Sequence, residues 1–279
     1  MARTNLNFHL TFKPERQYLS SLLSEVVACS GHDVQEISYL AGIPTGKSSG
    51  KVEPMICYAE YMGIITKEKS NGLYTLKRTA LGECIVIEDN GFLEKLSLLA
   101  LHTMLVRPFT GAELWAHIFN SVFPKYRNKL TQKQFNKEIE LQFGTGVKLA
   151  PFFGCYQDLM SPLNMLHCDE ETIEIRPAKL DSDFIFLYAF VLFQYWNEWL
   201  KYAAVEDTQL ASEKEITAVH LSKIGFRNPF GWNEAEEYQA LEMMANKGII
   251  VLNRQMVPFS IRKAVEIETI IDRLYSELC

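Results

Sequence analysis

Residues 34–88, VQEISYLAGIPTGKSSGKVEPMICYAEYMGIITKEKSNGLYTLKRTALGECIVIE, decide the fold of this chain. A helical pattern over 34–41 is followed by a turn rich in glycine and serine at 42–50, and a second helical pattern covers 51–63. Residues 64–78 then give a short apolar run, a polar hairpin tip and a strand that ends in two basic residues. This order of helix, turn, helix and hairpin predicts a winged helix-turn-helix that faces nucleic acid.

The turn contains Gly42 and the run Gly46-Lys47-Ser48, which is similar to a nucleotide phosphate loop. A phosphate loop has one more residue between its glycines and follows a strand, whereas this turn follows a helix. The better interpretation is that the next helix presents free backbone N–H groups to a nucleic-acid phosphate. The contact residues would then be Lys47, Ser48, Ser49 and Lys51. A solvated turn is the alternative.

Two other basic clusters are candidate DNA contacts. Lys77 and Arg78 lie on the predicted hairpin, where they would touch the DNA backbone or protect an edge strand. Lys125, Arg127 and Lys129 surround a tyrosine, a pattern typical of a groove that holds phosphates and stacks a base. The alternative for this run is a solvated helix face.

The rest of the chain predicts a mainly α fold with small β-hairpins, in the α+β class. We expect a winged helix-turn-helix domain at 1–90, a helical domain at 91–207 and a second winged-helix-like module at 208–279. The second module is predicted because the pattern of a helix end, a glycine and two isoleucines at 63–65 recurs at 248–250. A plain helix–hairpin–helix without a binding role is the alternative.

The composition limits the class of protein. A net charge of −6 excludes coating of nucleic acid by bulk charge, so any DNA contact must use a local basic patch. The six cysteines form no Cys-x-x-Cys pair and no apolar signal segment opens the chain, which indicates free thiols in a cytoplasmic protein. The longest apolar run is too short to cross a membrane, so we expect no membrane association.

No metal site or catalytic set is predicted from the residues. The run from His167 to Glu171 is rich in potential ligands, but neighbours on one loop seldom converge on an ion, and no zinc-type spacing occurs. A nuclease requires carboxylates around a divalent ion, or a nucleophile. The catalytic residues therefore stay unassigned.

Several short segments between residues 8 and 120 form a recognisable set. They are His9-Leu10-Thr11-Phe12 with Arg16, Gly46-Lys47-Ser48, Ile56-Cys57-Tyr58, Gly63-Ile64-Ile65, Thr79-Ala80-Leu81-Gly82, Leu99 to His102, and Trp115 with Phe119-Asn120. In these segments the chain resembles, over roughly residues 8–120, the DNA-nicking component B of the Ssp DNA-phosphorothioation systems, which is found beside cysteine desulfurases and PAPS-reductase-like proteins. One departure is that the family's first turn glycine falls at Ile43 or Pro44.

The resemblance implies that the protein binds double-stranded DNA and nicks one strand, so that partner enzymes can replace a phosphate oxygen by sulfur. The implied partners are a cysteine desulfurase, an ATPase and a PAPS-reductase-like enzyme, and Mg²⁺ or Mn²⁺ is the candidate cofactor. His9, Thr11 and Arg16 are matching polar positions without an assigned role. A homodimer is one option for the assembly. The alternatives are a non-enzymatic winged-helix DNA-binding regulator and an adaptor in a defence complex.

Overall fold

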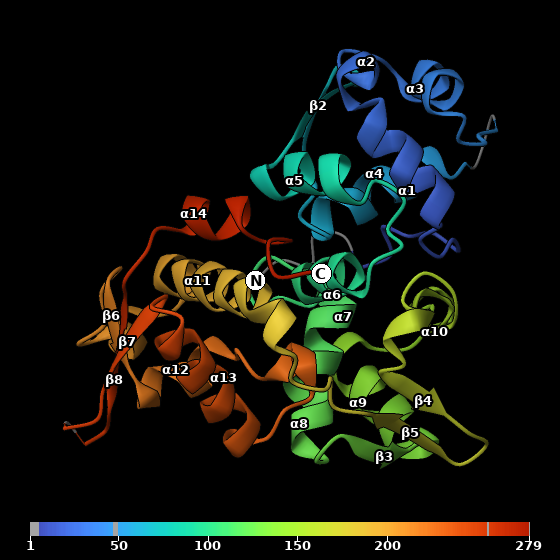
Figure 1. Ribbon diagram of the computed structural model, residues 1–279. Coiled ribbons are helices and arrows are strands. Elements are labelled where there is room, and N and C mark those ends of the chain that lie inside the picture. The colour runs from blue at the N-terminus through green and yellow to red at the C-terminus, as the bar shows by residue number, and fades with distance from the viewer. Residues whose placement is uncertain (1–5, 47–49, 256, 279) are drawn as a thin grey trace.

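The computed structural model describes residues 6–46, 50–255 and 257–278 and consists mainly of helices with small antiparallel sheets (Figure 1). This confirms the predicted fold class. The helices and strands fall into three successive sections, which share one hydrophobic core. The domain boundaries at 90 and 207 stay a prediction.

The first section has the predicted order of a winged helix. Asp33 caps α3 and forms a capping box with Glu36, while Gly42 ends that helix in the left-handed conformation. An isolated β-bridge joins His32 to Tyr74, so the segment before α3 lies beside the hairpin. The elements are α1 (Arg16–Ser24), α2 (Val26–Cys29), α3 (Val34–Ala41), α4 (Val52–Tyr61), β1 (Ile65–Ser70), β2 (Leu73–Arg78) and α5 (Ala80–Glu88).

The middle section is mainly helical, as predicted, but it also contains a three-stranded sheet in the order β3-β5-β4. Two of these strands are only three residues long, so they are too short to show an alternating pattern in the sequence. The elements are α6 (Lys95–Leu105), α7 (Glu113–His117), η1 (Ile118–Val122), α8 (Phe123–Lys125), β3 (Lys129–Thr131), α9 (Gln132–Phe143), α10 (Ala150–Gln157), η2 (Ser161–Leu163), β4 (Leu166–Cys168) and β5 (Thr172–Ile175).

The last section repeats the geometry of the first, as the sequence echo predicts. Gly63 and Gly248 both have a positive φ, of 73° and 74°, and each is followed by an isoleucine whose carbonyl accepts a hydrogen bond after the hairpin. The elements are η3 (Ser182–Phe184), α11 (Ile185–Tyr202), η4 (Val205–Thr208), β6 (Glu215–Thr217), α12 (Ala218–Ile224), η5 (Asn228–Phe230), α13 (Glu234–Asn246), β7 (Ile250–Asn253), β8 (Ser260–Lys263) and α14 (Ile267–Asp272).

The arrangement of strand, two helices and hairpin thus occurs three times. In the last section β6 pairs with β8, in the middle section β3 pairs with β5, and in the first section His32 pairs with β2. In each case the segment before the two helices pairs with the second strand of the hairpin. The middle section therefore shares this order of elements, which was not predicted from the sequence.

Helices α6 and α11 lie at the centre of the molecule, with the first section and α14 on one side and α8, α12 and α13 on the other (Figure 1). Every residue of α6 after Lys95 is buried, because the helix contacts all three sections. Among the described helices, none combines the length and apolarity needed to cross a bilayer.

Candidate nucleic-acid interface

The predicted recognition helix, α4, lies in the interior. Residues 6–12 cover it: the Tyr58 hydroxyl donates a 3.0 Å hydrogen bond to the Phe12 carbonyl, and the Phe8 and Tyr58 rings are 4.9 Å apart. Within α4 only Glu53 is exposed. A helix that enters a DNA groove needs an exposed polar or basic face. α4 itself therefore presents no exposed basic face to a DNA groove, and the contact of its N-terminal turn with a phosphate stays a prediction.

The basic residues around α4 are mostly held by the protein itself. Lys51 forms a 2.7 Å ion pair with Glu15 and packs over the Tyr18 ring. Arg78 donates hydrogen bonds to the carbonyls of residues 23 and 24, which fix the hairpin to the end of α1. Lys77 is exposed on β2 and forms no ion pair with the residues that the structure describes. The predicted contacts Lys47, Ser48 and Ser49 lie outside the described residues.

The three basic residues of the run in the middle section differ in whether an acidic side chain neutralises their charge. Lys125 lies 2.7 Å from Glu138, and Lys129 lies 3.5 Å from Glu174. The hydrogen bonds from Lys125 and from a tyrosine hydroxyl lower the pKa of Glu138. Arg127 is exposed and has no acidic partner in the part of the chain that the structure describes. Of the three predicted contacts, Arg127 therefore has its charge most available to a phosphate.

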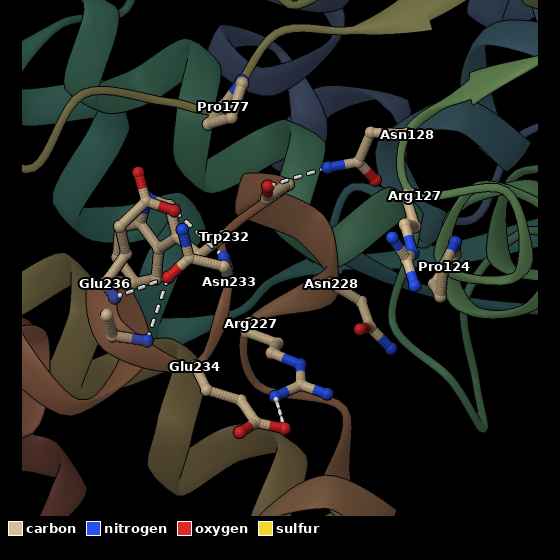
Figure 2. A pocket seen from close by; sticks show the side chains of 12 residues that line it. Pro124, Arg127, Asn128, Pro177, Arg227, Asn228, Trp232, Asn233, Glu234 and Glu236 are labelled. Carbon is tan, nitrogen blue, oxygen red and sulfur yellow. Dashed lines mark hydrogen bonds and ion pairs between the residues drawn. The ribbon is translucent and has the colours of Figure 1, made fainter.

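Arg127 lines an open cleft of about 680 Å³ between the α8–β3 connection and the segment from η5 to the start of α13. Figure 2 shows the side chains of Arg127, Asn228 and Arg227 on the same side of this cleft, with Trp232 and Asn233 facing them. Two guanidinium groups from segments 100 residues apart in sequence thus line one cavity. Arginine favours phosphate because its planar group donates several hydrogen bonds in a fixed geometry.

The backbone at Arg127 is held in an unfavourable conformation. Arg127 and Asn128 have φ angles of 51° and 66°, in the left-handed region that few residues other than glycine adopt. The surroundings fix this conformation: the Asn128 amide donates to the Gly231 carbonyl at 2.8 Å, and the Asn128 carbonyl accepts from Ile175 N–H at 2.8 Å. Such conformations concentrate at functional sites. We infer that the fold specifies the position of Arg127.

Arg227 is shared between the cleft and two carboxylates. Its guanidinium lies 3.2 Å from exposed Glu234 and 3.6 Å from buried Glu237. The start of α13 is already capped, since the Asn233 side chain accepts from the N–H groups of Ala235 and Glu236. An anion in this cleft would therefore be bound by the arginines and not by the helix end.

Residues in the segments of resemblance support the base of the cleft. His102 Nε2 donates to the Pro229 carbonyl at 2.8 Å, so its Nδ1 accepts from the Tyr156 hydroxyl at 3.0 Å. Burial lowers the pKa of His102 to about 4, so this histidine is neutral. The Asn120 side chain donates to two carbonyls and accepts from Asn228. His102 and Asn120 therefore fix the position of η5, and with it that of Arg227, which directly precedes η5.

The other matching polar residues lie away from the cleft. Arg16 donates a 2.5 Å hydrogen bond to the Phe92 carbonyl and so joins α1 to the start of the middle section. His9 is buried beside Trp115, and burial lowers its pKa to about 4. Thr11 is exposed. None of these three residues lines the cleft.

The described residues contain no group of three or more His, Cys, Asp or Glu side chains that could hold a metal ion. Near the cleft, Glu236 is occupied by the cap of α13 and Glu234 pairs with Arg227. A preformed metal site therefore does not fit these side chains, and no step is assigned to an ion.

The fold is similar to that of SspB. The similar solved structure is a magnesium ion-bound SspB crystal structure, which matches this chain with a TM-score of 0.65 and 16% sequence identity. The match covers 97% of this chain and 88% of the SspB chain. No protein-family model and no curated protein sequence matches the chain. The comparison extends the resemblance from roughly residues 8–120 to the fold of nearly the whole chain.

The sequence analysis missed Arg227 and Asn228. They lie in a turn that contains two glycines and a proline, and such a turn carries no sign of its partners in the tertiary structure. Asn233 caps α13 and so locates the start of this helix beside the cleft. No local sequence pattern indicates that residues 124–128 lie beside this turn in the tertiary structure.

Glu237 gives the cleft region a testable pH dependence. Burial raises the pKa of its carboxyl to about 7, so the folded protein binds a proton there that the unfolded chain releases above pH 4.5. The stability from this group is complete below pH 4.5 and is lost as the pH rises through 7. We expect Glu237→Gln to stabilise the protein at pH 8 by about 2 kcal/mol and to have little effect at pH 5.

Chemical denaturation at both pH values measures this difference. Glu242→Gln, which removes the same charge from a half-exposed position on the same helix, is the matched control. An equal effect of Glu237→Gln at pH 5 and pH 8 would contradict the assignment of a raised pKa.

Proposed function

We propose that this protein is an SspB-like subunit of a DNA phosphorothioate-modification system, which binds double-stranded DNA and nicks one strand. The single observation that supports this most is the fold similarity to SspB over 97% of the chain. The sequence resemblance to component B of the Ssp systems points to the same family. Nicking would open the strand for sulfur incorporation by a cysteine desulfurase, an ATPase and a PAPS-reductase-like enzyme.

In this proposal the cleft between α8 and α13 holds the DNA backbone. Arg127 and Arg227 would bind phosphates, and the exposed Arg176 and Lys179 flank the cleft residue Pro177. The protein is acidic overall, so a small group of available cations must supply the binding. We also propose Lys77 on the exposed hairpin as an outer contact. Lys51 is not assigned to DNA, because it lies outside the cleft and pairs with Glu15.

The metal requirement is part of the proposal. Mg²⁺ is commonly bound through one or two carboxylates together with substrate phosphates, and it keeps several waters. The magnesium in the SspB structure makes Mg²⁺ the first ion to test, with Mn²⁺ second. The catalytic residues of this chain are not assigned.

The test is conversion of supercoiled plasmid to the open circle by the pure protein with Mg²⁺, with Mn²⁺ and with EDTA. We expect open circles with at least one metal and none with EDTA, while linear DNA stays a minor product. Binding of the same plasmid is measured in parallel at low salt.

The two measurements separate the proposed nickase from the other functions. DNA binding without nicking under every metal would leave a non-enzymatic DNA-binding regulator. Absence of DNA binding at low salt would remove both and leave an adaptor that contacts only proteins.

A further inference from the structure

A groove of about 370 Å³ lies between α5 of the first section and α14 of the last. Its apolar lining consists of Ala80, Cys84, Ile87 and Ile271. Ile87 is 78% exposed, so its aliphatic side chain adds to the apolar surface of the groove. The Cys84 thiol contacts the Ile271 carbonyl at 3.6 Å, so the two helices are joined along the floor.

The other lining residues are all acidic: Glu83, Glu88, Glu268 and Asp272. None of the lining residues is basic. Within the described part of the chain, only Glu83 of these four forms an ion pair, with Arg78 at the long distance of 3.5 Å. The groove therefore combines an aliphatic floor with a negative rim.

Two of these carboxylates lie at helix C-termini, where the helix dipole disfavours a negative charge. Glu88 and Asp272 are the last residues of α5 and α14, and neither helix has a basic residue in its last turn. A helix C-terminus carries partial negative charge, so a carboxylate there is repelled. Arg273 follows directly, but it stacks on the Phe186 ring at 4.3 Å and pairs with Glu277 at 3.7 Å. The two helix ends therefore carry negative charge that no residue lining the groove neutralises.

The Cys84 thiol lies close to these negative charges. The pKa of its thiol is raised to about 11, first by burial and then by the negative charges of Glu88 and Asp272. A cation placed over the groove would be attracted by all of these groups.

The cation is not a bare metal ion. No set of three or more carboxylate, histidine or cysteine side chains in the described chain converges closely enough to hold one. The carboxylates are spread along an apolar floor, so their partner must present several positive charges and an aliphatic surface together. A protein segment with lysine or arginine beside aliphatic residues has this chemistry.

We propose that the groove between α5 and α14 is the docking site for a partner-protein segment with aliphatic side chains on one face and basic side chains at its edges. This surface is separate from the DNA cleft: α5 and α14 lie on the opposite side of α6 and α11 from α8 (Figure 1). DNA and the partner segment can therefore bind at the same time. The inference concerns protein contact and does not depend on the nicking activity.

The test uses a fluorescent amphipathic peptide of leucine and lysine at helical spacing, titrated with the full protein. We expect saturable binding that Glu268→Lys with Asp272→Lys weakens about tenfold. Ile87→Ser should weaken it about threefold without changing any charge. A second peptide with the same lysines and with serine in place of leucine should bind at least about tenfold more weakly.

The matched control is Glu140→Lys with Glu170→Lys, which makes the same change of charge at exposed positions away from the groove. It should alter the peptide affinity less than about twofold. An equal loss in this control, or no saturable binding by the unaltered protein, would overturn the proposal. Displacement of the peptide by Mg²⁺ beyond that by NaCl of the same ionic strength would also overturn it, since it would indicate an ion site.

Discussion

Replacing Arg127 and Arg227 by alanine should lower the affinity for double-stranded DNA roughly 10- to 100-fold at low salt. Each arginine that contacts a phosphate releases about one counterion, so the slope of log affinity against log salt should fall by roughly two. Arg127→Ala alone should account for about half of that change. Fluorescence anisotropy with labelled duplex at several salt concentrations measures both quantities.

The control for this prediction is Lys133→Ala with Lys137→Ala. These lysines are exposed on α9, outside the cleft, and their loss removes the same charge from the protein. We expect a change of less than about threefold and a nearly constant salt slope. A thermal melt of each variant verifies folding. An equal loss in both double variants would place the DNA contact elsewhere on the surface.

Gly82→Ala should destabilise the fold by about 3 kcal/mol or prevent folding. A methyl group at this position would stand 2.0 Å from the Ile64 carbonyl oxygen and 2.9 Å from its carbon, which are backbone atoms. The Thr79 side chain also accepts from Gly82 N–H, which fixes the first turn of α5 against the hairpin. The new side chain would therefore have to displace either the helix or the strand.

Gly154→Ala is the matched control, because Gly154 is also a helical glycine. Its added methyl group would meet only the Lys13 side chain, at 3.1 Å, and that flexible chain can move. Higher helix propensity offsets part of this contact, so we expect a change within about 1 kcal/mol. Urea denaturation of the two variants gives the comparison. Equal stability of Gly82→Ala and the unaltered protein would contradict the close contact of α5 with Ile64.

Much of the fold was predictable because its signals are local. The caps at Asp33 and Asn233, the glycines at 63 and 248 and the hairpin after α4 each depend on residues within a few positions of one another. The sheet of the middle section was not predictable in the same way. Each of its shortest strands buries at most one side chain, so periodicity cannot reveal it.

The candidate site was predictable only in part. The sequence indicated a basic run that included Arg127, but not that Glu138 and Glu174 neutralise its neighbours. It also placed the DNA contact on α4, whose helical pattern resembles that of an exposed recognition helix. The covering of α4 by residues 6–12 depends on contacts across more than 40 residues, which no local pattern contains.

The sequence by itself determined the mainly helical class, the winged-helix order of the first and last sections and the resemblance to the Ssp component B. These follow from side-chain periodicity, helix caps and turn residues, whose effects act within one element. The tertiary structure alone decided which charges are available. The charge of a lysine or arginine is neutralised or left free by groups that are distant in sequence. For this reason Lys51 is held by Glu15, while Arg127 and Arg227 meet at one cleft.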